Sequence, residues 1–536
     1  MIPASAYQKG ECVMNQTFRC DSTTALVETT KGFVKGYEHN GLSIFKGIPY
    51  ATARRFHAPE PVEKWEGVKD AASYGFVCPL MTNDRPGGEL YVPHRYWPMD
   101  EDCLNLNVWT PGLDSRARPV LVWLHGGGYE AGSSIEQAAY DGANMARLGD
   151  VVVVSINHRL NILGYFDLSD FGEEYANSAN AGTDDIIAAL RWIHENIDRF
   201  GGDPSNVTVF GQSGGGAKVT TLLQTPAADG LYAKGINMSG VIGPLLADEK
   251  GSGRELAEAV MARLGLSSVK KLETVDYRLL AKAYLELRPA FREAGKYTGC
   301  KPHPNRFYAG DPCAVGFREE TRSVPLLVGS VFSEFFSFSP APWDRASMSP
   351  AQQEEAVRAF VGNEGAEVLL PLFREAYPGR NLMDLLRLDY IFRAPEIEYI
   401  AKRSALNDCT FSYLFDLDQP ISGGTTPWHC SDIPYVFHNM DLVEHTHRPD
   451  GDNRAAERVQ EQVFSAVMAF ARTGSPACGP LPAWHPCRPG HEYTMLIGEE
   501  ARERENFDHD LIPAALRYLA PVAAKRMAQQ DANIQH

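Results

Sequence analysis

Residues 207–215 read Val-Thr-Val-Phe-Gly-Gln-Ser-Gly-Gly, and this stretch decides the fold, because an extended run leads into G-x-S-x-G and then into a helix. β-Branched residues favour the strand, and the glycines around Ser213 permit a tight turn that lifts the hydroxyl clear of the sheet. Taken alone, the pentapeptide could be an ordinary glycine-rich turn. With a strand before it and small residues opening a helix after it, the stretch predicts a nucleophile elbow at Ser213.

A second glycine loop lies upstream of the elbow. The apolar run at residues 120–124 leads into His125 and then Gly-Gly-Gly-Tyr at 126–129. Backbone N–H groups of such a loop can receive the negative charge that develops on oxygen in a tetrahedral intermediate. A flexible turn and a phosphate cradle are the alternatives, but the cradle requires G-K-[ST], which is absent here. We predict an oxyanion hole formed by Gly127 and Gly128 of this loop together with Gly214, which follows Ser213. His125 is expected to shape the loop.

The segments around these loops alternate between strand and helix patterns. Near-continuous apolar runs at residues 120–124 and 151–156 are typical of strands covered on both faces of a sheet. Residues 184–200 carry apolar side chains on one helix face, and Thr183 or Asp184 could cap the start. This helix, placed between the second run and the elbow strand, completes a βαβ unit.

Further elements follow from the same patterns. Short antiparallel edge strands are predicted at 31–37, 42–50 and 104–111, and further strands at 325–330 and 410–417. Helices are predicted within 347–403, at 454–472 with Gly474 ending the helix, and at 512–527.

Composition narrows the class of protein. The chain has 536 residues, of which 44% are hydrophobic and 22% charged, so it is globular and long enough to bury a large core. Its 51 basic and 68 acidic residues give a net charge of −17. The chain has no block of Lys and Arg residues that could bind along a phosphate backbone, so nucleic acid is not an expected partner. No flexible linker divides the chain, which favours one catalytic domain with insertions.

The N-terminus and the cysteines bear on the compartment. The N-terminus lacks a basic segment followed by an apolar one, and no apolar stretch is long enough to cross a bilayer. We therefore expect a cytoplasmic protein without a membrane partner. The ten cysteines leave disulfide bonds in an oxidising compartment open as an alternative.

Several longer motifs identify a family. They are F-K-G-I-P-Y-A at 45–51, E-D-C-L-N-L-N-V-W-T-P at 101–111, N-H-R-L-N-I-L-G-Y at 157–165, W-I-H-E-N-I-D-R-F-G-G-D-P at 192–204 and F-A-R-T-G-S-P at 470–476. Together with the two glycine loops, they resemble the motifs of the type-B carboxylesterase/lipase family, the cholinesterase-like α/β-hydrolases, and in particular bacterial carboxylesterases of the para-nitrobenzyl-esterase kind. The resemblance extends from about residue 31 to 486.

This resemblance implies an architecture. The fold class is α/β, with the large, mixed and mostly parallel central sheet of an α/β-hydrolase, helices on both faces and helical insertions covering the active site. We expect a single catalytic domain at 31–530, preceded by an extension at 1–30, with a mostly helical insertion at about 340–405.

The catalytic acid and histidine are expected after the elbow, in the order Ser, Asp or Glu, His. The segment after the strand at 325–330 resembles the family's G-[TS]-x-x-D-E and makes Glu334 the acid. Its rivals Asp311, Glu319 and Glu320 come before that strand instead of at its carboxyl end.

The histidine is placed by a second resemblance. Residues 428–437 resemble the family's H-G-x-E-[LI]-x-Y-V-F and identify His429 as the catalytic base. His438, His445 and His447 could instead be read as metal ligands, but their polar setting is that of an exposed loop. We predict neither a metal nor a cofactor.

Substrate preference follows from departures from the family pattern. Gln212 stands where the family usually has Glu, so a nearby negative charge is lost and neutral esters are favoured. Gly214 stands where the family usually has Ala. We predict a pocket lined by Tyr129, Gln212, Phe338 and Trp428. Cys78 and Cys103 resemble the family's first disulfide pair, which intracellular members can keep reduced.

These features predict a serine hydrolase that cleaves carboxylic esters of small molecules through a covalent acyl-enzyme. A lactonase, thioesterase or amidase would use the same groups and remains an alternative. A non-catalytic cholinesterase-like binding protein is the alternative from another class, but such proteins typically lose a triad residue. The oligomeric state is not predicted.

Overall fold

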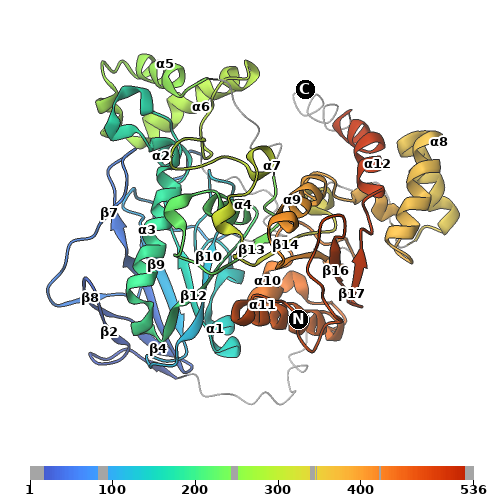
Figure 1. The fold of residues 1–536 in the computed structure, drawn as a ribbon, viewed down its shortest axis with the longest axis horizontal. Helices are drawn as coiled ribbons and strands as arrows, with labels where there is room; N and C mark the ends of the chain where they lie inside the picture. Colours follow the sequence, from blue (N-terminus) through green and yellow to red (C-terminus); the bar gives the residue numbers. More distant parts are fainter. Residues whose placement is uncertain are drawn as a thin grey trace, which may run out of the picture.

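A large mixed sheet organises the computed structural model, which describes residues 17–82, 94–242, 251–338, 345, 347–421 and 424–525 (Figure 1). Within these ranges, twelve strands follow the order β1-β4-β5-β9-β11-β10-β12-β13-β14-β15-β16-β17. They are β1 (Phe18–Arg19), β4 (Tyr37–His39), β5 (Leu42–Pro49), β9 (Asn105–Thr110), β11 (Val152–Ile156), β10 (Arg118–Leu124), β12 (Gly202–Gln212), β13 (Lys234–Met238), β14 (Leu326–Val331), β15 (Thr410–Phe415), β16 (Tyr493–Ile497) and β17 (Arg502–Glu505). The block from β11 to β16 is parallel and both margins are antiparallel. The predicted α/β class is confirmed.

The middle of the sheet is buried on both faces, as the apolar runs predict. In β10, Val122 lies opposite Val154 of β11 and Val209 of β12, and these three side chains enter one core with α3 (Ala181–Asn196) and α4 (Gly214–Leu223). Its neighbour Trp123 enters a second core with α1 (Ala143–Gly149) and α11 (Arg454–Thr473). Alternation along one strand thus supplies both layers.

The edge strands of the structure agree in part with those predicted from the sequence. The segments at 42–50 and 104–111 form β5 and β9, which pair antiparallel near one margin of the sheet. The segment at 31–37 contributes β3 (Gly32–Lys35) to a separate sheet with β2 (Leu26–Thr29) and β8 (Val68–Asp70).

The described part of the expected N-terminal extension is engaged by both sheets, since β1 pairs with β4 and β2 pairs with β3. The division at residue 30 stays a prediction.

The expected cap of the helix before the elbow is wrong. Helix α3 begins at Ala181, so Thr183 and Asp184 lie inside its first turn. A 3₁₀ turn at Ser178–Asn180 leads directly into the helix, and Asn180 takes the cap position without a side-chain hydrogen bond. A second 3₁₀ turn at Ile197–Phe200 then tightens the end before β12. The predicted strand, helix, strand unit is present, with β10 lying between β11 and β12.

Two groups of helices flank the sheet (Figure 1). Helices α5 (Arg254–Leu264) and α6 (Tyr277–Glu293) pack together at the upper left of the view. The predicted helical region contains α8 (Pro350–Ala376) and α9 (Arg393–Leu406); α8 packs on α12 (Leu511–Tyr518), and α9 packs on β14 and β15.

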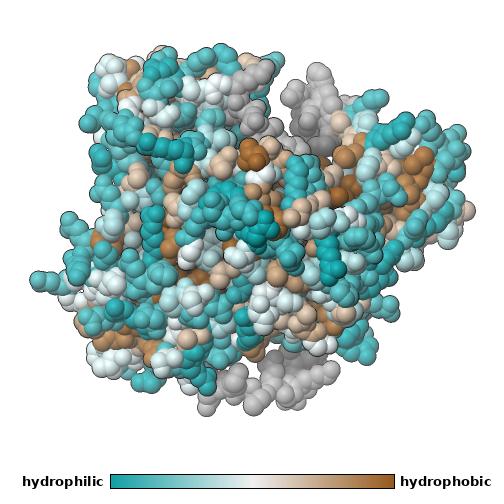
Figure 2. Space-filling model, in the orientation of Figure 1, coloured by the Kyte–Doolittle hydropathy of each residue, from teal (hydrophilic) through white to brown (hydrophobic). Residues whose placement is uncertain are grey.

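The C-terminal helices and the surface complete the description. Gly474 ends α11 as expected; α12 ends at Tyr518, residues 520–525 are again helical, and the last two residues of the predicted helix, 526 and 527, lie outside the described residues. Figure 2 shows a mainly hydrophilic face with small, separate apolar areas. None of the helices in the described ranges has the length and apolar character needed to cross a membrane.

Candidate active site

The elbow has the geometry that its sequence predicts. Strand β12 ends at Gln212 and α4 starts at Gly214, so Ser213 forms the whole turn, with φ 58° and ψ −126°. This backbone conformation is strained for a residue with a side chain, and its N–H is held by the carbonyl of Met238 at 2.8 Å. A Cβ on Gly215 would lie only 1.9 Å from the Leu124 carbonyl oxygen, so only glycine lets the helix approach β10 this closely.

Glu334 and His429 meet at the carboxyl ends of β14 and β15. Glu334 opens the 3₁₀ turn Glu334–Phe338 and is fully buried. Its Oε1 accepts from the backbone N–H of Val331 at 3.0 Å, while its Oε2 contacts Nδ1 of His429. The His429 N–H also donates to the Glu334 carbonyl at 3.2 Å. Both ring and backbone of the histidine are therefore fixed by the acid.

The elbow reaches this pair through Gln212. The side chain of Gln212 is fully buried, and its Nε2 lies 3.3 Å from Nε2 and 3.4 Å from Nδ1 of His429. Its Oε1 accepts from the thiol of Cys430 at 3.1 Å. The residue before Ser213 thus packs on the edge of the His429 ring, and the structure brings together residues from the ends of β12, β14 and β15.

Aromatic rings and two buried acids with raised pKa values complete the surroundings of His429. The ring centroids of Phe335 and Phe392 lie 4.4 and 5.3 Å from that of the imidazole. Burial, followed by the charge of Glu334, raises the pKa of Asp389 to about 8 and that of Asp432 to about 7. At neutral pH Asp389 is therefore mostly protonated and Asp432 about half protonated, so both place less negative charge near the histidine than free carboxylates would.

The predicted oxyanion glycines also converge. Gly127 and Gly128 adopt left-handed φ values of 84° and 65°. A Cβ on Gly214 would lie 2.2 Å from the carbonyl oxygen of Gly128 and 2.4 Å from its nitrogen, so the loop backbone rests directly on the start of α4.

Sequence reasoning missed Lys218, a buried residue of α4 whose Nζ donates to the carbonyls of His125 and Gly128 at 3.0 and 2.9 Å. Its signal was present, because it is the single charged residue in the apolar helix Gly214–Leu223.

Two of the predicted pocket residues, Tyr129 and Trp428, are buried and contact other side chains. Tyr129 is buried, and its hydroxyl lies 2.8 Å from that of Thr221. Trp428 is fully buried with its ring centroid 5.2 Å from that of His445. Gln212 contacts the histidine as described, and the side chain of Phe338 lies outside the described residues.

The rival acids and histidines have other partners. Asp311 caps the helix Pro312–Val315, Glu319 pairs with Arg322, and Glu320 lies 3.6 Å from Arg318. His438 contacts Glu461 at 2.9 Å. Across the described ranges, His, Cys, Asp and Glu side chains form no group of three placed to hold a metal ion.

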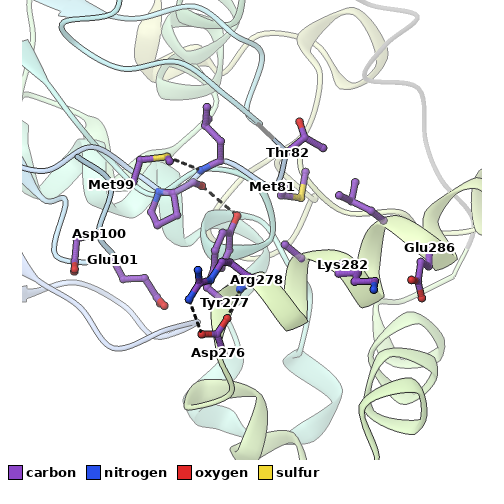
Figure 3. Close-up of a pocket in the computed structure, with 14 residues that line it drawn as sticks. Met81, Thr82, Met99, Asp100, Glu101, Asp276, Tyr277, Arg278, Lys282 and Glu286 are labelled. Carbon is purple, nitrogen blue, oxygen red and sulfur yellow. Dashed lines mark hydrogen bonds and ion pairs between the residues drawn. The ribbon is translucent and has the colours of Figure 1, made fainter. Parts of the chain in front are cut away.

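Two cavities share part of their lining, and the smaller one lies next to the residues that follow the oxyanion loop. The smaller, of about 260 Å³, is lined by Trp97, Met99 and Glu136 among others, and by Gly132 and Ser133, which follow the loop in sequence. The larger, of about 750 Å³, lies between segments 79–82 and 99–101 and helix α6 (Figure 3). Both cavities are lined by Leu80, Thr82 and Met99.

Comparisons with known proteins show the family of this chain. The model of the carboxylesterase family matches residues 23–511. The para-nitrobenzyl esterase of Bacillus subtilis is 34% identical over 476 residues, covering 86% of this chain and 93% of the relative. Phenmedipham hydrolase of Pseudarthrobacter oxydans is 31% identical over 505 residues, covering 90% of this chain and 96% of the relative.

Solved structures extend the similarity to three dimensions. An esterase from Clostridium hathewayi, described as able to hydrolyse aliphatic aromatic polyesters, superposes with a TM-score of 0.90 at 49% identity, covering 94% of this chain and 100% of the other. A thermophilic para-nitrobenzyl esterase gives a TM-score of 0.72 at 31% identity, covering 91% of this chain and 99% of the other.

Proposed function

The chain belongs to the carboxylesterase family and is a carboxylic ester hydrolase, and from this premise we propose that Ser213, His429 and Glu334 carry out its reaction. The observation that carries the proposal is the Glu334–His429 contact, against which the elbow of Ser213 packs through Gln212.

The proposed reaction has two halves. Ser213 Oγ attacks the ester carbonyl while Nε2 of His429 takes the hydroxyl proton, and Nδ1 stays hydrogen-bonded to Glu334. The tetrahedral intermediate then collapses, the alcohol leaves with the proton from His429, and an acyl-enzyme remains. Water, deprotonated by the same imidazole, hydrolyses this ester and releases the carboxylic acid. In both halves the N–H groups of Gly127, Gly128 and Gly214 receive the charge on the carbonyl oxygen.

We propose neutral esters as the substrate class, with room for extended ones. Gln212 brings no charge, and Glu136 beside the smaller cavity lies 3.5 Å from His94, which offsets its charge when that histidine is protonated. The smaller cavity, which Gly132 and Ser133 line just after the oxyanion loop, and the larger one that shares Leu80, Thr82 and Met99 with it are the places where we propose that an extended ester lies. The polyester activity stated for the Clostridium hathewayi enzyme supports the same proposal.

A substrate panel tests the class. We expect kcat/KM for neutral aryl and alkyl esters to exceed that for a choline ester of equal acyl chain, and to exceed the values for the matching lactone, thioester and amide. A preference for the choline ester beyond about tenfold, equivalent to about 1.4 kcal/mol, would refute the neutral class.

The nucleophile is tested by substitution and by labelling. Ser213→Ala should abolish ester hydrolysis and leave the unfolding temperature unchanged within a few degrees, because the hydroxyl forms the acyl bond and contributes little packing. A fluorophosphonate probe should label Ser213 in the wild type and no residue in the variant. An adduct on a different serine, located by peptide mass spectrometry, would refute the assignment.

We propose a cytoplasmic location. Cys78 and Cys103 are buried, unbridged neighbours, and the hydrogen bond between their thiols, with burial, raises the pKa of Cys103. The test is to denature the protein as isolated, without adding a reductant, and to treat it with an alkylating reagent. We expect both thiols to be alkylated.

A further inference from the structure

Lys218 occupies an unusual position for a lysine. It lies in the second turn of α4, five residues after Ser213, with 1% of its surface exposed. Its Nζ donates to the carbonyl oxygens of His125 at 3.0 Å and Gly128 at 2.9 Å. His125 precedes the three glycines of the oxyanion loop and Gly128 is the last of them, so one side chain spans the loop from end to end.

The surroundings do not compensate a buried charge. None of the ion pairs among the described residues includes Lys218, and the carboxylate that acts on it from a distance is Glu136. His125 and His158 stack 5.1 Å apart beside it, and burial together with the lysine lowers the pKa of each. Tyr129 faces the ammonium at 5.6 Å, and burial raises the pKa of its hydroxyl well above the usual value, so it stays neutral.

Burial lowers the pKa of Lys218 to about 7. A lysine held at this cost requires a role beyond packing, since an apolar side chain would fill the same space without a desolvation penalty.

The carbonyl groups of the loop show what that role is. The Gly126 oxygen lies 2.9 Å from Nδ1 of His125, and the Gly127 oxygen accepts from Ala131 N–H at 3.0 Å. Lys218 holds the remaining two, those of His125 and Gly128. Because C=O and N–H point in opposite directions across a trans peptide, fixing each carbonyl fixes the direction of the following N–H.

Helix α4 contacts Gly128 through two of its residues. Gly214 in the first turn of α4 touches its backbone, and Lys218 in the second turn holds its oxygen. A run of glycines has wide conformational freedom, and Gly128 at a φ of 65° has no side chain to anchor it. The loop therefore depends on such external contacts for a single conformation.

We propose that Lys218 is a positioning residue for the oxyanion hole: by holding the carbonyls of His125 and Gly128 it fixes the peptides on either side of the two that carry the Gly127 and Gly128 N–H groups, and so keeps the loop in the conformation that presents these N–H groups to the reacting oxygen. The inference rests on the proposed function. It predicts a loss confined to the transition state, because only there does the oxygen carry the negative charge that the aimed donors stabilise.

The test compares Lys218→Met with Lys234→Met. Methionine keeps the unbranched apolar stem and removes the donors. Lys234 is a matched control, because it is also buried and bonded to a neutral oxygen, that of Asn206, on β13. We expect Lys218→Met to lower kcat by about 10- to 100-fold with KM within about twofold, and the control to keep wild-type values.

A trifluoromethyl ketone provides the second readout. Ser213 Oγ adds to its carbonyl carbon, the hydroxyl proton passes to His429, and the carbonyl electron pair becomes an oxyanion in the hole. Its inhibition constant should rise by about the same factor as kcat falls. The unfolding temperature of Lys218→Met should equal or exceed that of the wild type, since a buried charge is removed.

Each outcome decides between explanations. Unchanged kcat and inhibition constant in Lys218→Met, or equal losses in the Lys234→Met control, would overturn the inference. Should Lys218→Met fail to fold, Lys218→Gln replaces it; its shorter amide cannot span both carbonyls, and wild-type ketone affinity would overturn the inference as well. Fluorophosphonate should label Ser213 in every one of these variants. This labelling tests the nucleophile assigned under the proposed function separately from Lys218, because an adduct on another serine would refute the nucleophile whatever the kinetics of Lys218→Met.

Discussion

Backbone strain at single residues marks the catalytic centre. Ser213, Glu334 and Cys430 have φ values of 58°, 37° and 79°, although each carries a side chain. Such conformations persist where the surrounding structure enforces them, and they concentrate at functional sites. Here the strained residues are Ser213 and Glu334 themselves and Cys430, which directly follows His429, so the strain lies at or next to all three proposed catalytic residues.

Glu334→Gln tests the acid at this scale. The amide keeps the size of the side chain but cannot stabilise a protonated imidazole, so kcat should fall by about a thousandfold while the fold is retained. Steady-state kinetics and circular dichroism measure both.

Glu319→Gln and Asp311→Asn are the matched controls. Glu319 pairs with Arg322 on the surface and Asp311 caps a short helix, so turnover within about threefold of wild type is expected. Wild-type turnover in Glu334→Gln would assign the triad acid to another carboxylate.

Between elements, α4 packs tightly against the oxyanion loop. The Gly214 Cα lies against the Gly128 backbone with no space for a methyl group. This close contact fits only glycine at position 214.

Gly214→Ala should therefore displace the loop. An added Cβ would stand 2.2 to 2.4 Å from backbone atoms that cannot rotate away. We expect kcat to fall by at least about tenfold. Gly479→Ala, where a Cβ meets nothing within 4 Å, is the control and should keep full activity. Full activity in Gly214→Ala would mean that the loop tolerates wider spacing.

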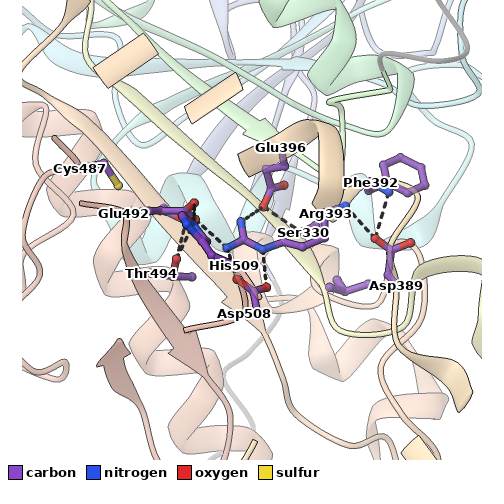
Figure 4. Close-up of polar contacts among 12 residues, drawn as sticks. Ser330, Asp389, Phe392, Arg393, Glu396, Cys487, Glu492, Thr494, Asp508 and His509 are labelled. Carbon is purple, nitrogen blue, oxygen red and sulfur yellow. Dashed lines mark hydrogen bonds and ion pairs between the residues drawn. The ribbon is translucent and has the colours of Figure 1, made fainter. Parts of the chain in front are cut away.

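At the scale of the whole molecule, a buried charge network joins the catalytic sheet to the C-terminal elements (Figure 4). Arg393 at the start of α9 contacts Asp508 at 2.7 Å, Glu492 at 2.7 Å and Glu396 at 2.9 Å. Glu396 also accepts from Ser330 of β14 at 3.3 Å. One guanidinium cannot neutralise three carboxylates, and burial raises the pKa of Glu396 to about 8.

This network gives stability a defined pH dependence. Between the ordinary pKa of 4.5 and about 8, the folded protein holds a proton on Glu396 that the unfolded chain releases. Glu396 therefore stabilises the fold less as pH rises through that window, by up to about 1.4 kcal/mol per pH unit.

Glu396→Gln removes this titration. Relative to wild type, the variant should gain stability steadily from pH 5 to 8, as measured by urea unfolding at each pH. A difference between the two proteins that stays constant across this range would show that Glu396 is already ionised.

The sequence by itself determined the elbow, the oxyanion loop and the buried strands, because these depend on local properties. Glycine at fixed spacing around Ser213 allows one strained turn, and continuous apolar runs allow only strands covered on both faces. The family motifs then indicated Glu334 and His429. The start of α3 escaped prediction because a 3₁₀ turn extends that helix toward its N-terminus, and no local cap residue signals such an extension.

Only the tertiary structure decided how distant residues meet. Gln212 contacts the histidine and Cys430 across 217 and 218 positions of the chain. Lys218 acquires its partners when α4 packs under a loop 90 positions upstream. Such contacts have no local pattern, because the packing of strands in the order β10, β12, β13, β14, β15 creates them. A local sequence pattern therefore specified the nucleophile, and the sheet order specified the groups that position it.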